Sequence, residues 1–397
     1  MKGLLSLSRL SAGLVAVIVG YTSSAVIIFQ AAAAAGATAA QISSWLWALG
    51  LGMGLSSILL SVYYRHPVLT AWSTPGAALL VTGLSGVSMN EAVGAFLLCS
   101  LLITLCGISG WFEKIMKHVP RSLAGAMLAG VLLQFGLDLF GALESRYLLV
   151  GGMLGTYLLV RQWLPRYVIP LALIVGLLVA ASQGLLKSEA FEWKLAAPVL
   201  MMPSFSLPVL IGVGIPLFIV TMASQNVPGI AVLRANGYQT PASPLIGWTG
   251  FTGLLLAPFG GFAFNLAAIT AAICMGKGAD PDASKRYFSS IWAGIFYLFT
   301  GLFGATVAGL FAAFPKELVM AIAGLALLGT IANSLASSLA DEEGREAALL
   351  TFLITASGIT AGGIGSAFWG LMIGLIAYHL NRRLSKPTTI QQTGPAR

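Results

Sequence analysis

Residues 67–80, PVLTAWSTPGAALL, decide the fold of this chain. The part up to Trp72 is rich in residues that favour extended backbone. Ser73 or Thr74, just before Pro75, has the pattern of a helix N-cap followed by proline at the first helical position. About five extended residues at ~3.3 Å and about eleven helical residues at ~1.5 Å cover ~33 Å, enough to cross the hydrocarbon of a bilayer. The stretch therefore predicts a membrane span that is half strand and half helix.

A second stretch, residues 260–274, repeats this pattern with the sequence GGFAFNLAAITAAIC. Here Asn265 occupies the position expected for the helix cap. The alternative is that Pro75 and the Gly260-Gly261 pair only kink ordinary helices. The matched position of the two stretches in the two halves of the chain favours two broken spans, which in transporters mark the binding site.

The composition places the whole chain in a membrane. Of 397 residues, 57% are hydrophobic and 9% are charged, against roughly 25% charged residues in an ordinary soluble domain. A soluble globular fold is therefore excluded. The net charge of +8 comes from basic residues scattered singly between apolar segments, which argues against nucleic acid as a partner. Cys99, Cys106 and Cys274 lie in or beside apolar stretches and are interpreted as core residues.

The apolar stretches predict an all-α polytopic membrane protein with fourteen spans. They cover residues 10–35, 41–63, 67–85, 90–112, 120–142, 146–163, 166–186, 206–233, 241–260, 261–276, 286–310, 316–338, 345–361 and 363–381. With the N-terminus in the cytoplasm, most Lys and Arg residues lie on the cytoplasmic side, while Arg146, Lys187, Lys194 and Lys316 lie outside. This asymmetry predicts that both termini are cytoplasmic.

Short matches about half a chain apart indicate an internal repeat. Residues 120–123, PRSL, correspond to residues 315–318, PKEL, and two more pairs of matches follow the same order. Chance similarity between Gly-, Ala- and Leu-rich helices is the alternative for each pair alone. Seven spans per half is an odd number, so the second half is inverted relative to the first, as in many secondary transporters.

Inversion makes the two half-helices start at mid-membrane and run in opposite directions. Their N-termini then present unpaired N–H groups and positive dipole ends to one point, which favours an anion. Polar residues also occur at the centres of two long spans, in the runs Tyr21–Ser24 and Ser224–Asn226. Buried amides need partners in hydrocarbon, so Gln225 and Asn226 are expected to face the site. Contacts between helices are the alternative, and for Ser23 and Ser24 individually they are favoured.

Ionisable groups are almost confined to loops and span ends. Asp138 lies within a span and is a candidate proton carrier; the alternative is an interfacial residue near Arg146. There is no G-x-x-x-x-G-K-[ST] loop, no H-E-x-x-H motif and no Cys/His cluster, so no cofactor or metal site is expected. No acid–base pair suited to catalysis is evident, and an enzyme is not expected.

Five segments resemble the benzoate:proton symporter family of the BenE type. They are GYTSSA (20–25), TAWSTPGA (70–77), MASQNVPG (222–229), AITAAIC (268–274) and GSAFWG (365–370). The resemblance covers essentially the whole chain and implies the fold of the uracil and other nucleobase transporters. It implies a core domain of residues 10–112 (spans 1–4) and 206–310 (spans 8–11). It also implies a gate domain of residues 120–186 (spans 5–7) and 316–381 (spans 12–14).

The chain departs from the proton-coupled nucleobase carriers of that fold, which the resemblance associates with glutamates on spans 8 and 10. The corresponding neighbourhoods offer Gln225, Asn226 and Asn265 instead. An aromatic carboxylate fits better, because its charge can rest on helix N-termini while an apolar wall holds the ring. The wall candidates, each of which could equally be a packing residue, are Phe29, Trp72, Phe262 and Phe264.

The sequence thus predicts a secondary active importer of benzoate or a related aromatic carboxylate, driven by protons, in a bacterial inner membrane. The carboxylate is expected on the backbone at residues 74–77 and 266–268. The expected substrate-binding residues are Tyr21, Ser23, Ser24, Trp72, Ser73, Thr74, Pro75, Gly76, Ala77, Ser224, Gln225, Asn226, Asn265, Leu266 and Ala267. The expected partners are the aromatic carboxylate, protons, the lipid bilayer and, in a homodimer, a second copy. The rivals are a carrier of another small anion or nucleobase-like solute, a channel and a membrane-embedded enzyme.

Overall fold

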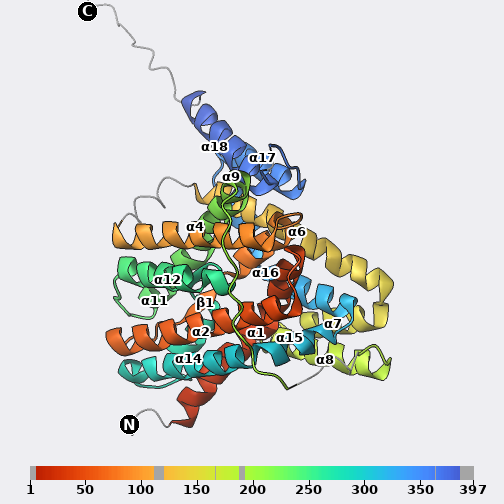
Figure 1. Ribbon diagram of the computed structural model, residues 1–397, viewed down its shortest axis with the longest axis vertical. Coiled ribbons are helices and arrows are strands. Elements are labelled where there is room, and N and C mark those ends of the chain that lie inside the picture. Colours follow the sequence, from red (N-terminus) through yellow and green to blue (C-terminus); the bar gives the residue numbers. More distant parts are fainter. Residues whose placement is uncertain (1–5, 111–119, 166, 187–192, 363, 385–397) are drawn as a thin grey trace, which may run out of the picture.

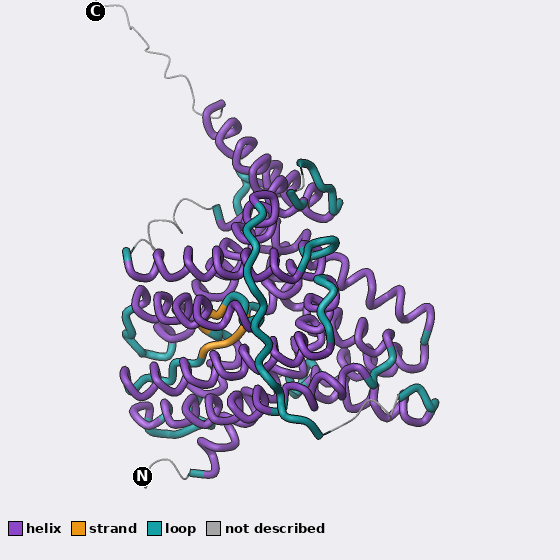
Figure 2. Tube along the Cα trace, in the orientation of Figure 1, coloured by secondary structure: helices purple, strands orange, loops and turns teal. Residues whose placement is uncertain are grey.

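The computed structural model describes residues 6–110, 120–165, 167–186, 193–362 and 364–384, and it is almost entirely helical (Figures 1 and 2). Lys187 and the outermost residues of both termini, which the sequence places in loops or at the cytoplasmic ends, lie outside these ranges. The α-helices are α1 (Leu7–Ala34), α2 (Ala39–Tyr64), α3 (Thr74–Gly83), α4 (Met89–Ile108), α6 (Arg121–Ser145), α7 (Tyr147–Val160), α8 (Val168–Ser182), α9 (Leu207–Val209), α10 (Ile215–Thr221), α11 (Val227–Ala235), α12 (Ala242–Leu256), α13 (Ile269–Met275), α14 (Tyr287–Leu302), α15 (Gly304–Ala312), α16 (Lys316–Leu339), α17 (Arg345–Ala356) and α18 (Ser366–Leu384). The other elements are the strands β1 (Thr70–Trp72) and β2 (Phe264–Leu266), the π-helical turns η2 (Leu210–Gly214) and η3 (Met222–Asn226), and the 3₁₀ turns η4 (Ala257–Phe259) and η5 (Ala283–Lys285).

Six helical segments in the described ranges are long and apolar enough to cross a membrane, or seven if one bent pair counts as a single span. They are residues 7–34, 39–64, 89–108, 121–145, 207–234 and 316–339. The bent pair is the predicted span 286–310, in which α14 and α15 meet at 67°. At this bend Gly304 lies against α2, where a Cβ would come within 3.1 Å of the Ser43 carbonyl oxygen. The chain is a multi-pass membrane protein, while the count of fourteen and the inverted repeat stay predictions.

The predicted span 206–233 is one long helix interrupted by η2 and η3. Each of these π-turns is followed by a proline at the second position of the next helix, Pro216 in α10 and Pro228 in α11. Proline has no N–H, and its ring clashes with the carbonyl four residues earlier, so the regular bonding pattern cannot pass through it. The helix widens to i→i+5 bonding there, and this places Ser224, Gln225 and Asn226 on the second π-turn.

The helices pack in two groups (Figure 1). In one, α2 packs along α14, α4 along α12, and α1 against α3 and α14. In the other, α6 packs along α16 and α17, α7 along α8, and α17 along α18. Contacts of α1 with α8 and α16, and of α3 with α6, join the two groups. Helices α1, α3, α6, α8 and α16 therefore lie where the two groups meet.

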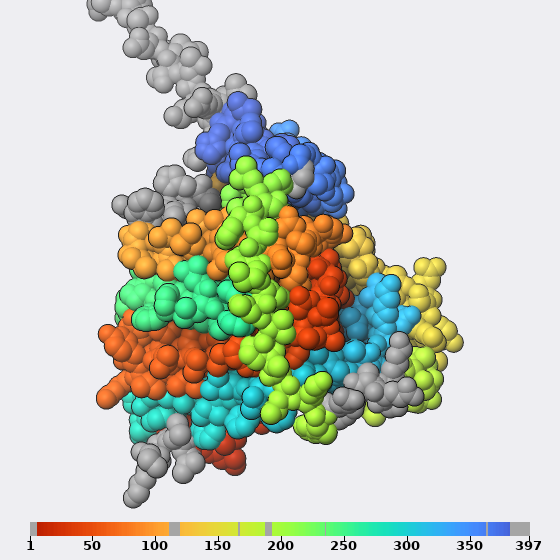
Figure 3. Space-filling view, in the orientation of Figure 1, coloured from red at the N-terminus to blue at the C-terminus, as the bar shows by residue number. Residues whose placement is uncertain are grey.

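An extended strap, residues 193–206, crosses the first group on the face shown in Figures 1 and 3. Its backbone N–H groups bond to several elements, among them Val199 to the Ser44 hydroxyl of α2, Met201 to the Pro258 carbonyl of η4, and Ser204 to the Asn90 carbonyl of α4. These bonds satisfy the strap's polar backbone and tie the ends of separate helices together.

Strands β1 and β2 form an antiparallel ladder inside the first group, visible in the middle of the helices in Figure 2. The register pairs Thr70 with Leu266, Ala71 with Asn265, and Trp72 with Phe264. Backbone bonds extend the ladder at both ends, from Ser73 N–H to the Ala263 carbonyl (3.1 Å) and from Ala267 N–H to the Leu69 carbonyl (2.9 Å). Each strand leads into a short helix, α3 or α13, and the antiparallel order sends these helices in opposite directions.

Side chains occupy the two outer edges of this ladder. On the β1 side, the Ser57 hydroxyl accepts from Thr70 N–H at 3.0 Å, and the Ser61 hydroxyl donates to the Val68 carbonyl at 2.7 Å. On the β2 side, Asn226 Oδ1 accepts from Leu266 N–H at 3.0 Å. A buried strand edge without such partners would leave unpaired polar groups, each costing several kcal/mol in a membrane interior.

The two strand–helix junctions differ in their caps. Ser73 caps α3 as expected, since its hydroxyl accepts from Gly76 N–H at 3.0 Å and Pro75 follows within the first turn. The predicted cap Asn265 is wrong, because this residue lies within β2 and its Nδ2 donates to the Ala263 carbonyl. The helix α13 starts only at Ile269, without a side-chain cap. Pairing with Ala71 keeps Asn265 extended, and this overrides its local capping preference.

Helices α2 and α14 approach closely through glycines. A Cβ on Gly50 would lie 2.4 Å from Gly301 Cα, and one on Gly54 would lie 2.8 Å from the Gly294 carbonyl oxygen. Small residues at helix crossings are the usual means of close packing in membranes, where lipid offers no hydrophobic driving force between helices.

We expect Gly50→Ala to lower the free energy of unfolding by about 1–3 kcal/mol, because the added methyl meets backbone and cannot be accommodated by a side-chain rotation. Gly141→Ala on α6 is the matched control, since nothing lies within 4 Å of its Cβ position. Unfolding in mixed micelles with increasing SDS measures both variants. Equal stability of the two variants would contradict the close approach.

Candidate functional site

A cavity of about 970 Å³ lies between the two helix groups. From the first group it is lined by α1, α2, β1, α3, α10, η3, α11, α13 and α14, and from the second by α6, α8 and α16. The predicted site residues that line it are Ser23, Ser24, Trp72, Thr74, Pro75, Ser224, Gln225 and Ala267. The other predicted site residues, which are not among the lining residues, are Tyr21, Ser73, Gly76, Ala77, Asn226, Asn265 and Leu266.

Two aromatic side chains form part of the cavity wall, Trp72 at the end of β1 and Tyr297 on α14. The Trp72 indole N–H donates to the Ser24 hydroxyl at 2.8 Å, and Ser24 in turn donates to the Gly20 carbonyl. The Tyr21 ring packs edge-on against Trp72, with centroids 4.8 Å apart. Ser24 and Tyr21 therefore fix the orientation of the indole, and Ser24 acts on the cavity mainly through Trp72.

The other three aromatic wall candidates pack away from the cavity. Phe29 contacts Phe311, with ring centroids 4.8 Å apart. Phe262 is fully buried between Trp45 and Phe96, and Phe264 is buried against α2, where it fills the space left by Gly52. The sequence missed Tyr297, because it lies in an apolar helix with no motif around it.

Most backbone donors expected to hold a carboxylate are already bonded. In α3, Gly76 N–H is capped by Ser73, Ala77 N–H bonds to the Ser73 carbonyl, and Pro75 has no N–H. This leaves Thr74 N–H as the donor at that helix end with no acceptor among the described residues. The backbone part of the predicted carboxylate site, residues 74–77, is thereby reduced to Thr74.

On the β2 side the same prediction fails for two residues. Leu266 N–H is bonded to Asn226 Oδ1, and Ala267 N–H is bonded to the Leu69 carbonyl. These groups belong to the edge and the end of the strand ladder. Neither N–H is free to bind a carboxylate, although Ala267 still lines the cavity.

The neighbouring amides Gln225 and Asn226 point in different directions. Adjacent residues on the π-turn η3 point in different directions, and here Gln225 lines the cavity while Asn226 is fully buried behind it. Asn226 is engaged through both amide atoms, since Oδ1 accepts from Leu266 N–H and Nδ2 contacts Met222 Sδ at 3.2 Å. The half-buried Gln225 amide has no hydrogen-bond partner in the described part of the chain. Gln225 is therefore free to bind a solute.

One end of the cavity carries polar groups that the sequence did not single out. Arg121, at the first position of α6, is the one charged residue among the described lining residues. Thr330, Asn333, Ser334 and Ser337 of α16 line the cavity as well. Polar residues within the mostly apolar stretch 316–338 could have indicated that this helix lines a cavity. That they share the cavity with Arg121 of α6 follows only from the packing of the two helices.

Asp138 does not line the cavity. It lies on α6, where Gln134 Nε2 donates to its Oδ1 at 2.7 Å from one turn earlier. Within the described ranges, no group of three or more His, Cys, Asp and Glu side chains is placed to hold a metal ion.

Comparison with known proteins identifies the family to which the chain belongs. Residues 3–380 match the sequence profile of the BenE family, described as benzoate membrane transport protein. The chain is 51% identical over 369 residues to inner membrane protein YdcO of Escherichia coli, covering 93% of this chain and 94% of that protein. It is 41% identical over 375 residues to the benzoate membrane transport protein of Acinetobacter baylyi, covering 94% and 95% of the two chains.

Two solved structures share the fold at 13% sequence identity. The murine Slc26a9 anion transporter in its inward-facing state gives a TM-score of 0.63 over 95% of this chain and 68% of that one. The transmembrane domain of the cyanobacterial bicarbonate transporter BicA gives 0.59 over 94% and 97%. The predicted likeness to the uracil transporters is not tested by these neighbours. The protein is a membrane transporter and not an enzyme, and the chain belongs to the BenE family.

Proposed function

We propose that this protein imports benzoate or a related aromatic carboxylate together with protons across the bacterial inner membrane. The observation that carries the proposal is the composition of the cavity wall. An aromatic pair, Trp72 and Tyr297, lies in the same cavity as an uncommitted amide, Gln225, and a free helix N–H, that of Thr74. The side chains of Trp72 and Tyr297 suit packing against an aromatic ring. The Gln225 amide and the Thr74 N–H suit hydrogen bonds to a carboxylate.

The relatives agree with this substrate class. A protein that shares 41% of its residues is named a benzoate transporter, and the neighbours in fold are named transporters of anions. A small inorganic anion such as bicarbonate is the rival. The aromatic lining favours the aromatic acid, since an inorganic anion has no ring to place on Trp72.

Alternating access would come from movement between the two helix groups, which we propose as the core and gate domains. In support, the cavity takes its lining from both groups, so any sliding or rocking of one group against the other would open and close it. Arg121 lies at the first position of α6, and the predicted topology places this end of the helix on the cytoplasmic side. The cavity as described would then face the cytoplasm, and Arg121 would attract the carboxylate at the mouth. Relatives of the predicted fold often dimerise, and a homodimer stays part of this proposal.

The proton is proposed to travel with the substrate. No Asp or Glu lies among the described lining residues, and Asp138 bonds to Gln134 elsewhere on α6. A carboxylate and one proton moving together carry no net charge. Neutral donors such as the Gln225 amide suit such a pair, because they bind it without a fixed counter-charge.

Gln225→Ala is expected to weaken benzoate binding roughly tenfold to a hundredfold, the effect of losing about 1.5–3 kcal/mol of hydrogen bonding to a charged group. Its thermal stability without ligand should stay close to that of the wild type. Asn226→Ala, one residue away, should instead lower the free energy of unfolding by about 1–3 kcal/mol, because Leu266 N–H loses its partner. Isothermal titration and thermal unfolding in detergent measure the two quantities. Unchanged affinity in Gln225→Ala would remove that residue from the site.

Proteoliposomes test the transport itself. With an acidic exterior, labelled benzoate should enter faster than into protein-free liposomes, and unlabelled benzoate should compete better than bicarbonate or uracil. Because the proposed pair is neutral, a potassium diffusion potential imposed with valinomycin should leave the initial rate unchanged. Uptake no faster than in protein-free liposomes would refute the proposed function, whereas potential-dependent uptake would refute only the one-to-one coupling.

Asp138→Asn separates the two routes for the proton. We expect the variant to keep uptake that depends on the pH gradient, since Asp138 does not line the cavity. Benzoate exchange without a gradient serves as the control for correct folding. Loss of the gradient dependence with intact exchange would make Asp138 the proton carrier.

A further inference from the structure

A second pocket, of about 460 Å³, opens at one end of the first helix group and shares no lining residue with the first cavity. Three loops meet there: the one after α2, the one between α11 and α12, and the one between α13 and α14. His66 and Thr240 are joined by a 2.6 Å hydrogen bond, and Tyr238 Oη donates to the Ala283 carbonyl at 2.9 Å. These bonds make the pocket a built feature of the fold.

Two cations line this pocket, and no acidic residue does so within the described ranges. Arg65 ends α2 in the left-handed conformation, with φ of 52°, and its exposed guanidinium makes no ion pair in the described part of the chain. Lys285 is half exposed and pairs with Asp282 at 2.9 Å. Arg65 is therefore the cation that is free to bind an anion.

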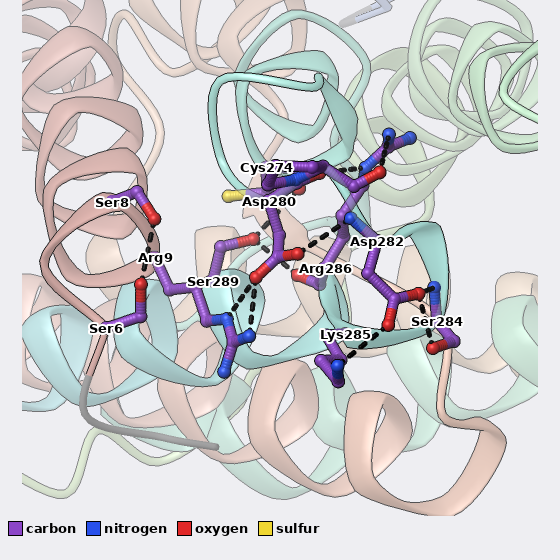
Figure 4. A network of polar contacts seen from close by, with 11 residues as sticks. Ser6, Ser8, Arg9, Cys274, Asp280, Asp282, Ser284, Lys285, Arg286 and Ser289 are labelled. Atoms are coloured by element: carbon purple, nitrogen blue, oxygen red, sulfur yellow. Dashed lines mark hydrogen bonds and ion pairs between the residues drawn. The ribbon is translucent and has the colours of Figure 1, made fainter. Parts of the chain in front are cut away.

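Charges behind the pocket wall add to its positive potential (Figure 4). Arg9 and Asp280 form a buried pair that neutralises itself. Arg286 is buried too, but its guanidinium donates to the carbonyls of Asp280, Met275 and Pro281 and pairs with no carboxylate. The region thus holds four cations and two acids, which are Arg9, Arg65, Lys285, Arg286, Asp280 and Asp282. Two positive charges, those of Arg65 and Arg286, are left uncompensated.

The charge state of this region is steady near neutral pH. Hydrogen bonds from Ser284 and Lys285 lower the pKa of Asp282 to about 2, so it remains ionised. Burial lowers the pKa of His66, which leaves the ring neutral. The two uncompensated charges therefore persist across the physiological range.

Aromatic residues border the same end of the first group. Tyr63 is 77% exposed at the end of α2, and Tyr287 and Phe288 line the pocket at the start of α14. Exposed tyrosines at the ends of spanning helices are typical of the level of the lipid headgroups. Arg65 and Lys285 also belong to the side that the charge asymmetry predicts to be cytoplasmic, where anionic lipids attract basic residues.

We propose that this pocket binds the phosphate of an anionic phospholipid headgroup, with Arg65 as its main ligand and Lys285 as a second cation. The site sits on the loops of a single helix group. It is independent of the substrate site, so its test does not depend on benzoate transport.

The test uses the purified full-length chain in a non-ionic detergent, titrated with short-chain phosphatidylglycerol while the thermal unfolding midpoint is followed. A ligand that binds the folded state raises this midpoint by mass action. Phosphatidylcholine of the same chain length and inorganic phosphate are the comparison ligands. The expected result is a rise with phosphatidylglycerol and none with the other two. Equal stabilisation by phosphatidylcholine would overturn the charge recognition, and equal stabilisation by inorganic phosphate would overturn the lipid assignment.

Variants locate the binding. Arg65→Asn removes the charge but tolerates the left-handed backbone, and it should weaken the apparent affinity for phosphatidylglycerol about fivefold. Arg65→Lys keeps the charge and should recover most of the affinity. Lys277→Gln, an exposed cation of the α13–α14 loop that does not line the pocket, is the matched control and should behave as the wild type. Wild-type affinity in Arg65→Asn, or an equal loss in Lys277→Gln, would refute the site.

Discussion

The structure depends on one constraint: a two-stranded ladder inside a membrane protein has two edges, and every polar group on them needs a partner. Hydroxyls of α2 bond to the β1 edge, and Asn226 bonds to the β2 edge. With these partners in place, extended backbone can be buried among apolar helices without unpaired polar groups. The short helices α3 and α13 can then begin in the interior and leave in opposite directions.

The same constraint shapes the candidate site. The N–H groups of Leu266 and Ala267 and the amide of Asn226 are committed to the ladder, so they cannot also bind a substrate. Groups that make no bond within the ladder stay available: the Thr74 N–H, the Gln225 amide and the Trp72 ring. The two amides are adjacent on the π-turn before Pro228 and point in different directions, one toward the ladder and the other toward the cavity. Structure and recognition thus use adjacent residues without competing for the same atoms.

The two pockets of the structure differ in the number of cations that line them. The candidate cavity has a single charged residue among its described lining residues, Arg121, and its other polar lining groups are neutral. The cations of the other pocket, Arg65 and Lys285, belong to loops at the end of one helix group. Neutral donors suit a solute that must be released, whereas uncompensated cations suit an anionic membrane surface that remains in place.

The sequence by itself determined the membrane class, the strand-then-helix pattern after Pro67 and the Ser73–Pro75 cap, because composition and capping are local properties. Its length and apolar patterning also located most of the helices. Only the tertiary structure decided which of Gln225 and Asn226 faces the cavity, that Asn265 is held in a strand, and that Tyr297 and Arg121 share a cavity with Trp72. Those outcomes depend on strand register and on the packing of helices far apart in the chain, which no local pattern encodes.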